Sequence, residues 1–379
     1  MRIFILGGGA TGGLLAQLLR RQGHRVRCGD RSPERALPFL GRRMTCVEVN
    51  ARYHRSIRRA AEGCQLLVNA APAVFNESAI RAALRLKVHY LDMASHLCRD
   101  PFRAEQLEYA EAFERRGRLA LINAGVAPGL TNLLVARCAR LLDAVDRAHV
   151  RLFEDTESEV PVSTWSAEVA HDEAVSLPRV YRRGRFRLAR RFSGAEWFDF
   201  PNPIGRARVV LAAQDEVATL PRCIPMRHMD VKIGGNEMLR LRRWFRQGRL
   251  RTSDDRAERR FPDTATPAEV AELIRRGKLR NARFALAVSV VGEKGGRCLE
   301  LRRDCLFPTL RKLRSMRLVA TPIAFAAAQS AAAFVENLPR GMAGAIPPEE
   351  LPPETAAAVI ESLRRRGFRF RRRTAVVEK

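Results

Sequence analysis

The sequence predicts an α/β fold in which a doubly wound parallel sheet at the N-terminus is followed by a second domain of α+β type. Three observations support this prediction. An apolar strand runs directly into a glycine-rich turn, strand-like and helix-like segments then alternate up to about residue 124, and the alternation stops beyond Gly129. With 379 residues, the chain is also long for a single hydrophobic core.

The first domain begins with a strand at residues 2–6, which is apolar throughout, as a parallel strand covered on both faces should be. The turn from Gly7 to Gly13 follows. Leucines then recur at helical spacing until Gly23, and residues 25–29 form a strand that closes on Asp30. Further strands are expected at 65–71, 88–93 and 119–124, with helices at 79–86 and 105–115.

The second half has strand-like segments such as 148–152 and 208–212 without regular helices between them, and prolines interrupt the region. This pattern favours an antiparallel sheet with long loops. Thr266, Pro267 and Glu269 have the spacing of a capping box with a first-turn proline, so a helix should begin there and end before Gly277. An alanine-rich helix should start at Thr321, and a last helix is expected at 354–365.

The net charge of +27 would ordinarily indicate a nucleic-acid or membrane-surface partner. Only six of the 68 basic residues are lysine, and the arginines are spread along almost the whole chain. Such a skew is more typical of a codon bias than of a selected surface, so nucleic-acid binding is kept only as the minor alternative.

The cysteines and the apolar segments limit the class of protein further. The eight cysteines are scattered singly, which argues against a zinc site or a redox dithiol and predicts no metal. The N-terminus reaches glycine too soon for a signal peptide, and the longest apolar stretch, 318–335, is interrupted by polar residues and short for a bilayer. We therefore expect a cytoplasmic protein without a membrane segment.

A dinucleotide site is predicted at the glycine-rich turn. The pattern Gly-x-Gly-x-x-Gly follows a strand and opens a helix, and Asp30 closes the next strand at the offset typical of dinucleotide-binding units. The glycines allow the tight turn, the approach of a pyrophosphate and close packing of helix on strand, and the helix amides face the phosphates. The residues expected to contact the cofactor here are Gly7, Gly9, Ala10, Thr11, Gly12, Asp30, Arg31 and Ser32.

Asp30 is the expected acceptor for the ribose hydroxyls, which favours NAD because a carboxylate repels a 2′-phosphate. Arg31 and Ser32 keep NADP open, since both could serve a 2′-phosphate if Asp30 turned away.

Several segments together resemble the saccharopine dehydrogenase-like oxidoreductases, a family that includes carboxynorspermidine and homospermidine synthases as relatives. The segments are Gly7–Gly12, Val68–Pro72, Val88–Asp92, Gly125–Asn132, Ser163–Ser166, Tyr181–Gly184, Pro347–Glu350 and Arg366-Gly367. The resemblance covers most of the chain.

The resemblance implies a Rossmann domain at 1–129, an inserted α+β substrate and dimerisation domain at 130–318, and a C-terminal helical segment at 319–379 that returns to the Rossmann domain. It also implies hydride transfer at a C–N bond of an amino-acid or polyamine adduct in amino-acid metabolism, and a homodimer. By position in the family, the turn from Asn69 to Pro72, which contains Ala70 and Ala71, should border the cofactor, as should Ala94, Ser95 and Gly125.

The chain departs from the family at three positions. Family reductases that make saccharopine carry aspartate where this chain has Ala127, often tyrosine where it has His96, and proline where it has Ala167. One acid–base group of the family is therefore missing, which argues against saccharopine as the substrate. A cofactor-binding protein without catalysis is the alternative that this departure supports.

Proton transfer to the reacting nitrogen requires a group with a pKa near working pH, and histidine suits that role. His96 is the leading candidate because it follows a strand at the carboxyl edge of the predicted sheet; the alternative is a loop histidine bound to backbone. His171 and Asp172 form a second cluster that a solvated helix face would explain equally well. Possible substrate contacts are Asn132, Trp165 and Ser166, and one arginine of the second domain should bind a substrate carboxylate.

Overall fold

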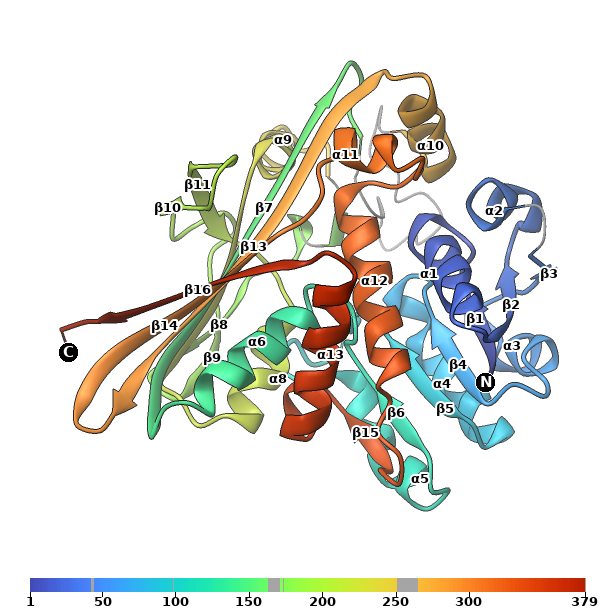
Figure 1. Cartoon of the computed structure of the whole chain (residues 1–379), viewed down its shortest axis with the longest axis horizontal. Helices are drawn as coiled ribbons and strands as arrows, with labels where there is room; N and C mark the ends of the chain where they lie inside the picture. Colours follow the sequence, from blue (N-terminus) through green and yellow to red (C-terminus); the bar gives the residue numbers. More distant parts are fainter. Residues whose placement is uncertain (42–43, 98, 163–170, 173, 251–264, 379) are drawn as a thin grey trace. The chain divides into compact units, whose positions relative to one another are not determined.

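The computed structural model describes residues 1–378 except 42–43, 98, 163–170, 173 and 251–264. It divides into two compact units, each with a sheet of its own (Figure 1). Unit 1 comprises Met1–Leu130 and Ala324–Arg366, and unit 2 comprises Thr131–Ile323 and Gly367–Lys379.

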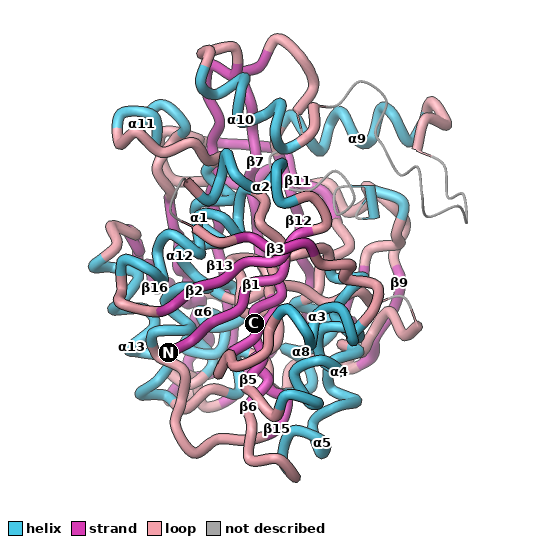
Figure 2. Tube along the Cα trace, turned by 90° about the vertical axis from the view of Figure 1, so that its right-hand side faces the viewer, coloured by secondary structure: helices cyan, strands magenta, loops and turns pink. Residues whose placement is uncertain are grey.

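Unit 1 contains a seven-stranded sheet in the order β15-β6-β5-β4-β1-β2-β3, and all its pairings are parallel. Figure 2 shows these strands in magenta. The order reverses between β1 and β4, as in the dinucleotide-binding sheet, so the predicted fold class is confirmed. The strands are β1 Arg2–Leu6, β2 Arg25–Asp30, β3 Cys46–Glu48, β4 Leu66–Asn69, β5 His89–Asp92, β6 Leu119–Leu121 and β15 Gly344–Ile346.

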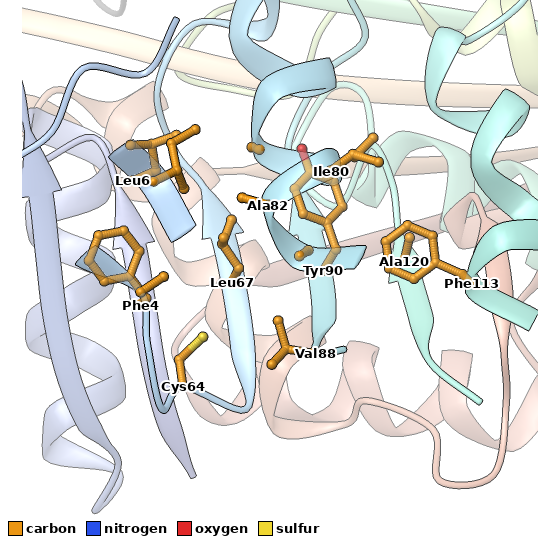
Figure 3. Close-up of a cluster of buried hydrophobic side chains, with 14 of the residues drawn as sticks. Phe4, Leu6, Cys64, Leu67, Ile80, Ala82, Val88, Tyr90, Phe113 and Ala120 are labelled. Carbon is orange, nitrogen blue, oxygen red and sulfur yellow. The ribbon is translucent and has the colours of Figure 1, made fainter. Parts of the chain in front are cut away.

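Helices flank this sheet on both sides because successive strand residues, which point to opposite faces, are apolar and buried. On one face, Phe4, Leu67 and Tyr90 pack with Ile80 and Phe113 in the core shown in Figure 3. The helical segments of the N-terminal part are α1 Ala10–Arg21, α2 Pro33–Leu40, α3 His54–Ala60, η1 Ala73–Phe75, α4 Asn76–Leu86, η2 Glu105–Tyr109 and α5 Ala110–Glu114. The single helix expected at 105–115 is therefore split into η2 and α5.

The C-terminal segment returns to unit 1 as predicted, through α12 Pro322–Glu336, β15, η3 Pro348–Glu350 and α13 Pro353–Arg365. The Arg366 guanidinium pairs with Glu336 at 2.7 Å. From Gly367 onward the structure differs from the expected helical segment. Strand β16, Arg369–Val376, pairs antiparallel with β14, Arg297–Leu306, of unit 2, where Phe370 lies opposite Cys305. The arginines of this strand gave no apolar alternation that would have predicted it.

Unit 2 contains a nine-stranded sheet whose main path is β10-β11-β12-β7-β13-β14-β16. It is mixed and not purely antiparallel as expected, because β12 pairs parallel with β7 while the other pairings are antiparallel. The long connection between β7 and β12 allows these two strands to run in the same direction. Its remaining strands are β7 Ala144–Ser158, β8 Arg179–Arg182, β9 Arg185–Leu188, β10 Glu196–Asp199, β11 Arg206–Leu211, β12 His228–Gly234, β13 Leu279–Lys294 and β14 Arg297–Leu306.

The helices of this half are α6 Leu130–Ala139, α8 Glu216–Cys223, α9 Asn236–Arg246, α10 Pro267–Arg275 and α11 Leu310–Ser315. The capping box predicted for α10 is confirmed, since Thr266 and Glu269 bind each other's backbone N–H. Among the helices that the structure describes, none is long and apolar enough to span a bilayer.

Candidate functional site

At the carboxyl edge of the unit 1 sheet, loops that are far apart in the sequence contact one another. The backbone N–H of Gly8, in the turn after β1, donates to Asp30 Oδ2 at 2.8 Å. The N–H of Ala70, after β4, donates to the Leu6 carbonyl at 2.8 Å. The glycine turn, the end of β2 and the turn after β4 therefore meet at the switch point, where open α/β sheets bind ligands.

Gly7 and Gly12 are required by the geometry of the turn. Gly7 has φ +95°, and a Cβ on it would lie 2.7 Å from the Ala71 nitrogen. A Cβ on Gly12 would lie 2.0 Å from the Gly7 carbonyl oxygen. Only glycine lets the helix, the turn and the Ala70-Ala71 segment approach this closely.

Gly12→Ala is expected to destabilise unit 1 by ~3 kcal/mol or more, because the added methyl group meets rigid backbone and not a movable side chain. The measurement is urea unfolding monitored by hydrogen exchange of peptides from residues 1–130. Gly9→Ala is the matched control, since no atom lies within 4 Å of a Cβ at Gly9. Equal stability of the two variants would contradict the packing described for the turn.

Gly9 differs from the other two glycines because open space lies beside it. It has φ −68° and ψ −164°, and it precedes α1 without a side-chain cap. In α10, by contrast, Thr266 caps the first turn. The first N–H groups of a helix have no partner within the helix, so the amides at Ala10, Thr11 and Gly12 form a cradle of the kind that binds phosphate.

Asp30 is held in a fixed orientation at the end of β2. Its Oδ2 accepts from Gly8 N at 2.8 Å and its Oδ1 from Ser32 N at 3.1 Å. The carboxylate therefore faces the glycine turn and is not turned away. Arg31 is exposed and Ser32 is half-buried.

Asn69, at the end of β4, orders the turn that contains Ala70, Ala71 and Pro72. Its Oδ1 accepts from Ala71 N at 3.1 Å, and its Nδ2 donates to Asn76 Oδ1 at 2.8 Å. Asn69 and Asn76 are almost completely buried, whereas the turn itself is half-buried. The three predicted cofactor residues thus lie beside the glycine turn on a rigid support.

Asp92, at the end of β5, is a buried carboxyl group with backbone and side-chain donors. Its Oδ1 accepts from Asn123 N at 2.7 Å and its Oδ2 from Gln106 Nε2 at 3.0 Å. Burial raises the pKa of Asp92 to about 7, against the opposing effect of these hydrogen bonds. A group with such a pKa changes its protonation state near neutral pH.

Ser95 follows β5, and its hydroxyl donates to Asn123 Oδ1 at 2.9 Å. His96 is half-buried in the same loop. Gly125, after β6, is buried, and a Cβ on it would lie 2.9 Å from the Met93 carbonyl oxygen. All three predicted residues therefore belong to the loops that follow β5 and β6, at the same edge of the sheet as the glycine turn.

Asn132 lies in unit 2 and is fully buried at the start of α6. Its Nδ2 donates to Thr219 Oγ1 of α8 at 3.2 Å, and the neighbouring Thr131 hydroxyl donates to Glu216 Oε1 at 2.8 Å. These contacts join α6 to α8, and the substrate contact expected of Asn132 stays a prediction.

The other predicted residues of unit 2 are Trp165, Ser166, His171 and Asp172. Trp165 and Ser166 lie outside the residues that the structure describes. His171 is buried, so the alternative of a solvated helix face does not hold for it; its Nδ1 lies 3.6 Å from Asp172 Oδ1. Within the described ranges, no group of three or more His, Cys, Asp or Glu side chains could hold a metal ion.

A charged cluster lies on one face of the unit 2 sheet. Arg151 pairs with Glu196 and Asp230, each at 2.5 Å, and Lys232 pairs with Glu196 at 2.5 Å. Burial works against ionisation of Asp230, but the hydrogen bond from His149 and the charge of Arg151 lower its pKa overall. Both buried cations thus already have carboxylate partners, so neither is a free anchor for a substrate carboxylate.

The sequence placed Asn69 in the turn expected beside the cofactor, but the other buried polar residues that support the candidate site were not predicted. They are Asn76, Asp92, Glu105, Gln106 and Asn123. A signal was present for two of them, because Asp92 and Asn123 each end or follow an apolar strand segment. Polar residues at the ends of successive parallel strands lie at one edge of the sheet.

Comparison with known proteins agrees with the resemblance seen in the sequence. Residues 3–121 match the family model described as the saccharopine dehydrogenase NADP-binding domain. The carboxynorspermidine synthase of Vibrio alginolyticus is 27% identical over 178 residues, which cover 45% of this chain and 43% of that protein. The chain therefore aligns with less than half of that relative's length.

Among solved structures, the apo saccharopine dehydrogenase (L-Glu forming) of Saccharomyces cerevisiae is similar over 99% of both chains. The TM-score is 0.69 and the sequence identity is 11%. At this identity the likeness shows a shared fold across both units.

Proposed function

We propose that this chain, whose residues 3–121 match the saccharopine dehydrogenase NADP-binding domain, is a nicotinamide-dependent oxidoreductase acting at a C–N bond of an amino-acid or polyamine adduct. The observation that carries the proposal is the open space at Gly9 beside an uncapped helix N-terminus, with Asp30 held at the end of the adjacent strand. The likeness to carboxynorspermidine synthase and saccharopine dehydrogenase supports the C–N chemistry.

The residues at the turn fit a dinucleotide. The amides of Ala10, Thr11 and Gly12 would bind the pyrophosphate, and Asp30 would accept from the ribose hydroxyls. Ala70, Ala71 and Ser95 would border the nicotinamide end by their position in the sheet. The cofactor, when bound, supplies or accepts the hydride.

NAD is favoured over NADP because two backbone N–H groups hold the Asp30 carboxylate toward the glycine turn. The 2′-phosphate of NADP, which replaces the ribose 2′-hydroxyl of NAD, would lie beside the negative charge of this carboxylate. The exposed Arg31 is the feature that would support NADP if Asp30 were absent.

Asp30→Ala is expected to reverse this preference. The wild type should bind NADH more tightly than NADPH, and the variant should lose about ten-fold in NADH affinity, the equivalent of about 1.4 kcal/mol for a charge-assisted hydrogen bond, while NADPH binding improves. Fluorescence titration of both nucleotides measures this, with Glu34→Ala on α2 as the control. An unchanged preference in Asp30→Ala would show the nucleotide assignment to be wrong.

Proton transfer is assigned to His96, which lies in the loop after β5 at the same edge of the sheet as the cofactor cradle. Its imidazole would hold the proton that the reacting nitrogen gains or loses. The other family position for an acid–base group is Ala127, which is almost fully buried and carries no titratable atom. Residue 127 therefore cannot transfer the proton in place of His96.

Turnover is tested with purified protein, NADH or NADPH, and a panel of keto acids paired with amino acids or polyamines. Nucleotide oxidation that depends on both carbonyl and amine would support the proposal. Tight nucleotide binding without oxidation by any pair would favour a cofactor-binding protein without catalysis, the second function that Ala127 supports. Loss of turnover in His96→Gln with unchanged nucleotide affinity would support the role given to His96.

A cytoplasmic location, a homodimer and the absence of a nucleic-acid partner stay predictions. Light scattering after size-exclusion chromatography would measure the oligomeric state. Retention on DNA that falls steeply with salt would instead support the nucleic-acid alternative.

A further inference from the structure

The loop that contains His96 is bound by side chains from outside it. We call residues 94–97, which follow β5, the His96 loop. The Ala94 carbonyl accepts from Asn76 Nδ2 at 2.8 Å and from Gln106 Nε2 at 3.2 Å. The N–H groups of His96 and Leu97 both donate to the carboxylate of Glu105. Three of the loop's backbone polar groups therefore have side-chain partners.

Glu105 is the centre of this arrangement. Its Oε1 accepts from His96 N at 2.9 Å and from Asn76 Nδ2 at 2.9 Å, and its Oε2 accepts from Leu97 N at 3.3 Å. Hydrogen bonds to an ionised acceptor are stronger than neutral ones. A single carboxylate thus joins two consecutive amides of the loop to Asn76 at the start of α4.

The supporting side chains are rigid because they are buried. Asn76 is 1% exposed and Gln106 is fully buried. Asn76 is held by Asn69, and Gln106 by Asp92, so the support extends to the ends of β4 and β5. Asn76 uses both of its side-chain polar atoms in these bonds and Gln106 uses its Nε2, and such buried hydrogen bonds restrict the arrangement of the surrounding chain.

The loop adopts a conformation that it would not favour alone. Leu97 has φ +51°, in the left-handed region that leucine rarely occupies, and its side chain is buried. Such a residue is strained and persists only where the surroundings impose it. The bond from Leu97 N to Glu105 lies at this residue, so it opposes relaxation of the loop.

We propose that Glu105 is a positioning residue that fixes the backbone of the His96 loop and so sets the place of Ser95 and His96 beside the cofactor. It acts through the loop backbone and is not assigned any contact with cofactor or substrate. The catalytic consequence rests on the function proposed above, whereas the structural one does not.

Glu105→Gln tests the proposal with a side chain of the same size. An amide has one acceptor oxygen and places an NH₂ group against donors that the carboxylate accepted. Amide exchange of peptides covering the His96 loop should accelerate about ten-fold, equivalent to about 1.4 kcal/mol, because at least one charge-assisted hydrogen bond to the loop is lost. Peptides from β1 and β4 should keep the wild-type rate.

Glu108→Gln is the matched control, because Glu108 lies on the same helical turn η2 with its side chain 49% exposed. Glu105→Asp is the second variant, which keeps the charge but shortens the reach, and it should also loosen the loop. Wild-type exchange in the loop of both Glu105 variants would overturn the proposal. So would faster exchange spread equally over unit 1, because that would show a general loss of stability.

Kinetics separate this inference from the proposed function. In an active enzyme, Glu105→Gln should lower kcat about ten-fold while nucleotide affinity changes less than about two-fold, since the glycine turn is untouched. If the wild type turns over no substrate, the proposed function fails while the exchange experiment still decides the loop. Normal kcat in a variant with a loosened loop would overturn the link from Glu105 to catalysis.

Discussion

Gly9→Leu should abolish dinucleotide binding while unit 1 stays folded. The backbone at Gly9 is extended with φ −68°, which leucine adopts freely, and no atom lies within 4 Å of the added Cβ. The side chain would occupy the space through which a pyrophosphate must approach the amides of α1. We expect NADH affinity to fall by about 100-fold or more, equivalent to about 2.7 kcal/mol, with little change in the free energy of unfolding.

NADH fluorescence titration and urea unfolding measure the two effects. Arg21→Leu places a leucine at the exposed end of the same helix and should change neither. Gly9→Ala adds only one methyl group and should weaken binding less than Gly9→Leu. Wild-type NADH affinity in Gly9→Leu would contradict the placement of the cofactor at the glycine turn and, with it, the proposed function.

The N-terminal strand, turn, helix and second strand could be predicted because their signals are local. Apolar residues at 3–6, leucines at helical spacing and glycines at fixed offsets each act within a few residues. The capping box of α10 is local for the same reason. The sequence signals that start and end such segments lie within the segments themselves, so they can be recognised without knowledge of the tertiary contacts.

The C-terminal strand could not be predicted because its partner is distant in the sequence. Residues 369–376 contain four arginines, which suggested a charged run. The segment becomes a strand because β14 lies beside it, with Phe370 opposite Cys305 and the ring of Phe368 5.0 Å from that of Phe307. Strand pairing of this kind depends on contacts that a local pattern does not contain.

The candidate site divides in the same way. The residues of the glycine turn could be predicted because each glycine of the motif allows a backbone approach that a side chain would block. Glu105 and Gln106 belong to no motif, since they lie on the short helical turn η2 and reach Asn76 at the start of α4 and Asp92 at the end of β5 only through the fold. The contact between Asn132 and Thr219 likewise depends on the fold, because residue 219 is far from residue 132 in the sequence.

Asp92→Asn should change how the stability of unit 1 depends on pH. Burial raises the pKa of Asp92 to about 7 in the folded chain, whereas an unfolded aspartate titrates near about 3.9. Between these values the folded chain holds a proton that the unfolded chain has lost, so stability falls as the pH rises through this range. The difference corresponds to about 4 kcal/mol, lost between about pH 4 and pH 7.

Asparagine is uncharged at every pH and so resembles the protonated carboxyl group. The variant should therefore gain about 4 kcal/mol relative to the wild type between pH 4 and pH 8. Near pH 4 the variant should be the less stable of the two, because one oxygen that accepts from Gln106 is replaced by a donor. Urea unfolding at several pH values, followed by exchange of peptides from residues 1–130, measures the difference.

Asp100→Asn is the control, since it makes the same substitution at an exposed aspartate of the same unit. A constant difference between Asp92→Asn and the wild type across the same pH range would mean that Asp92 stays ionised in the fold. The hydrogen bonds from Asn123 and Gln106 would then outweigh the cost of burial, and the polar residues at this edge of the sheet would carry a fixed negative charge beside the cofactor loops.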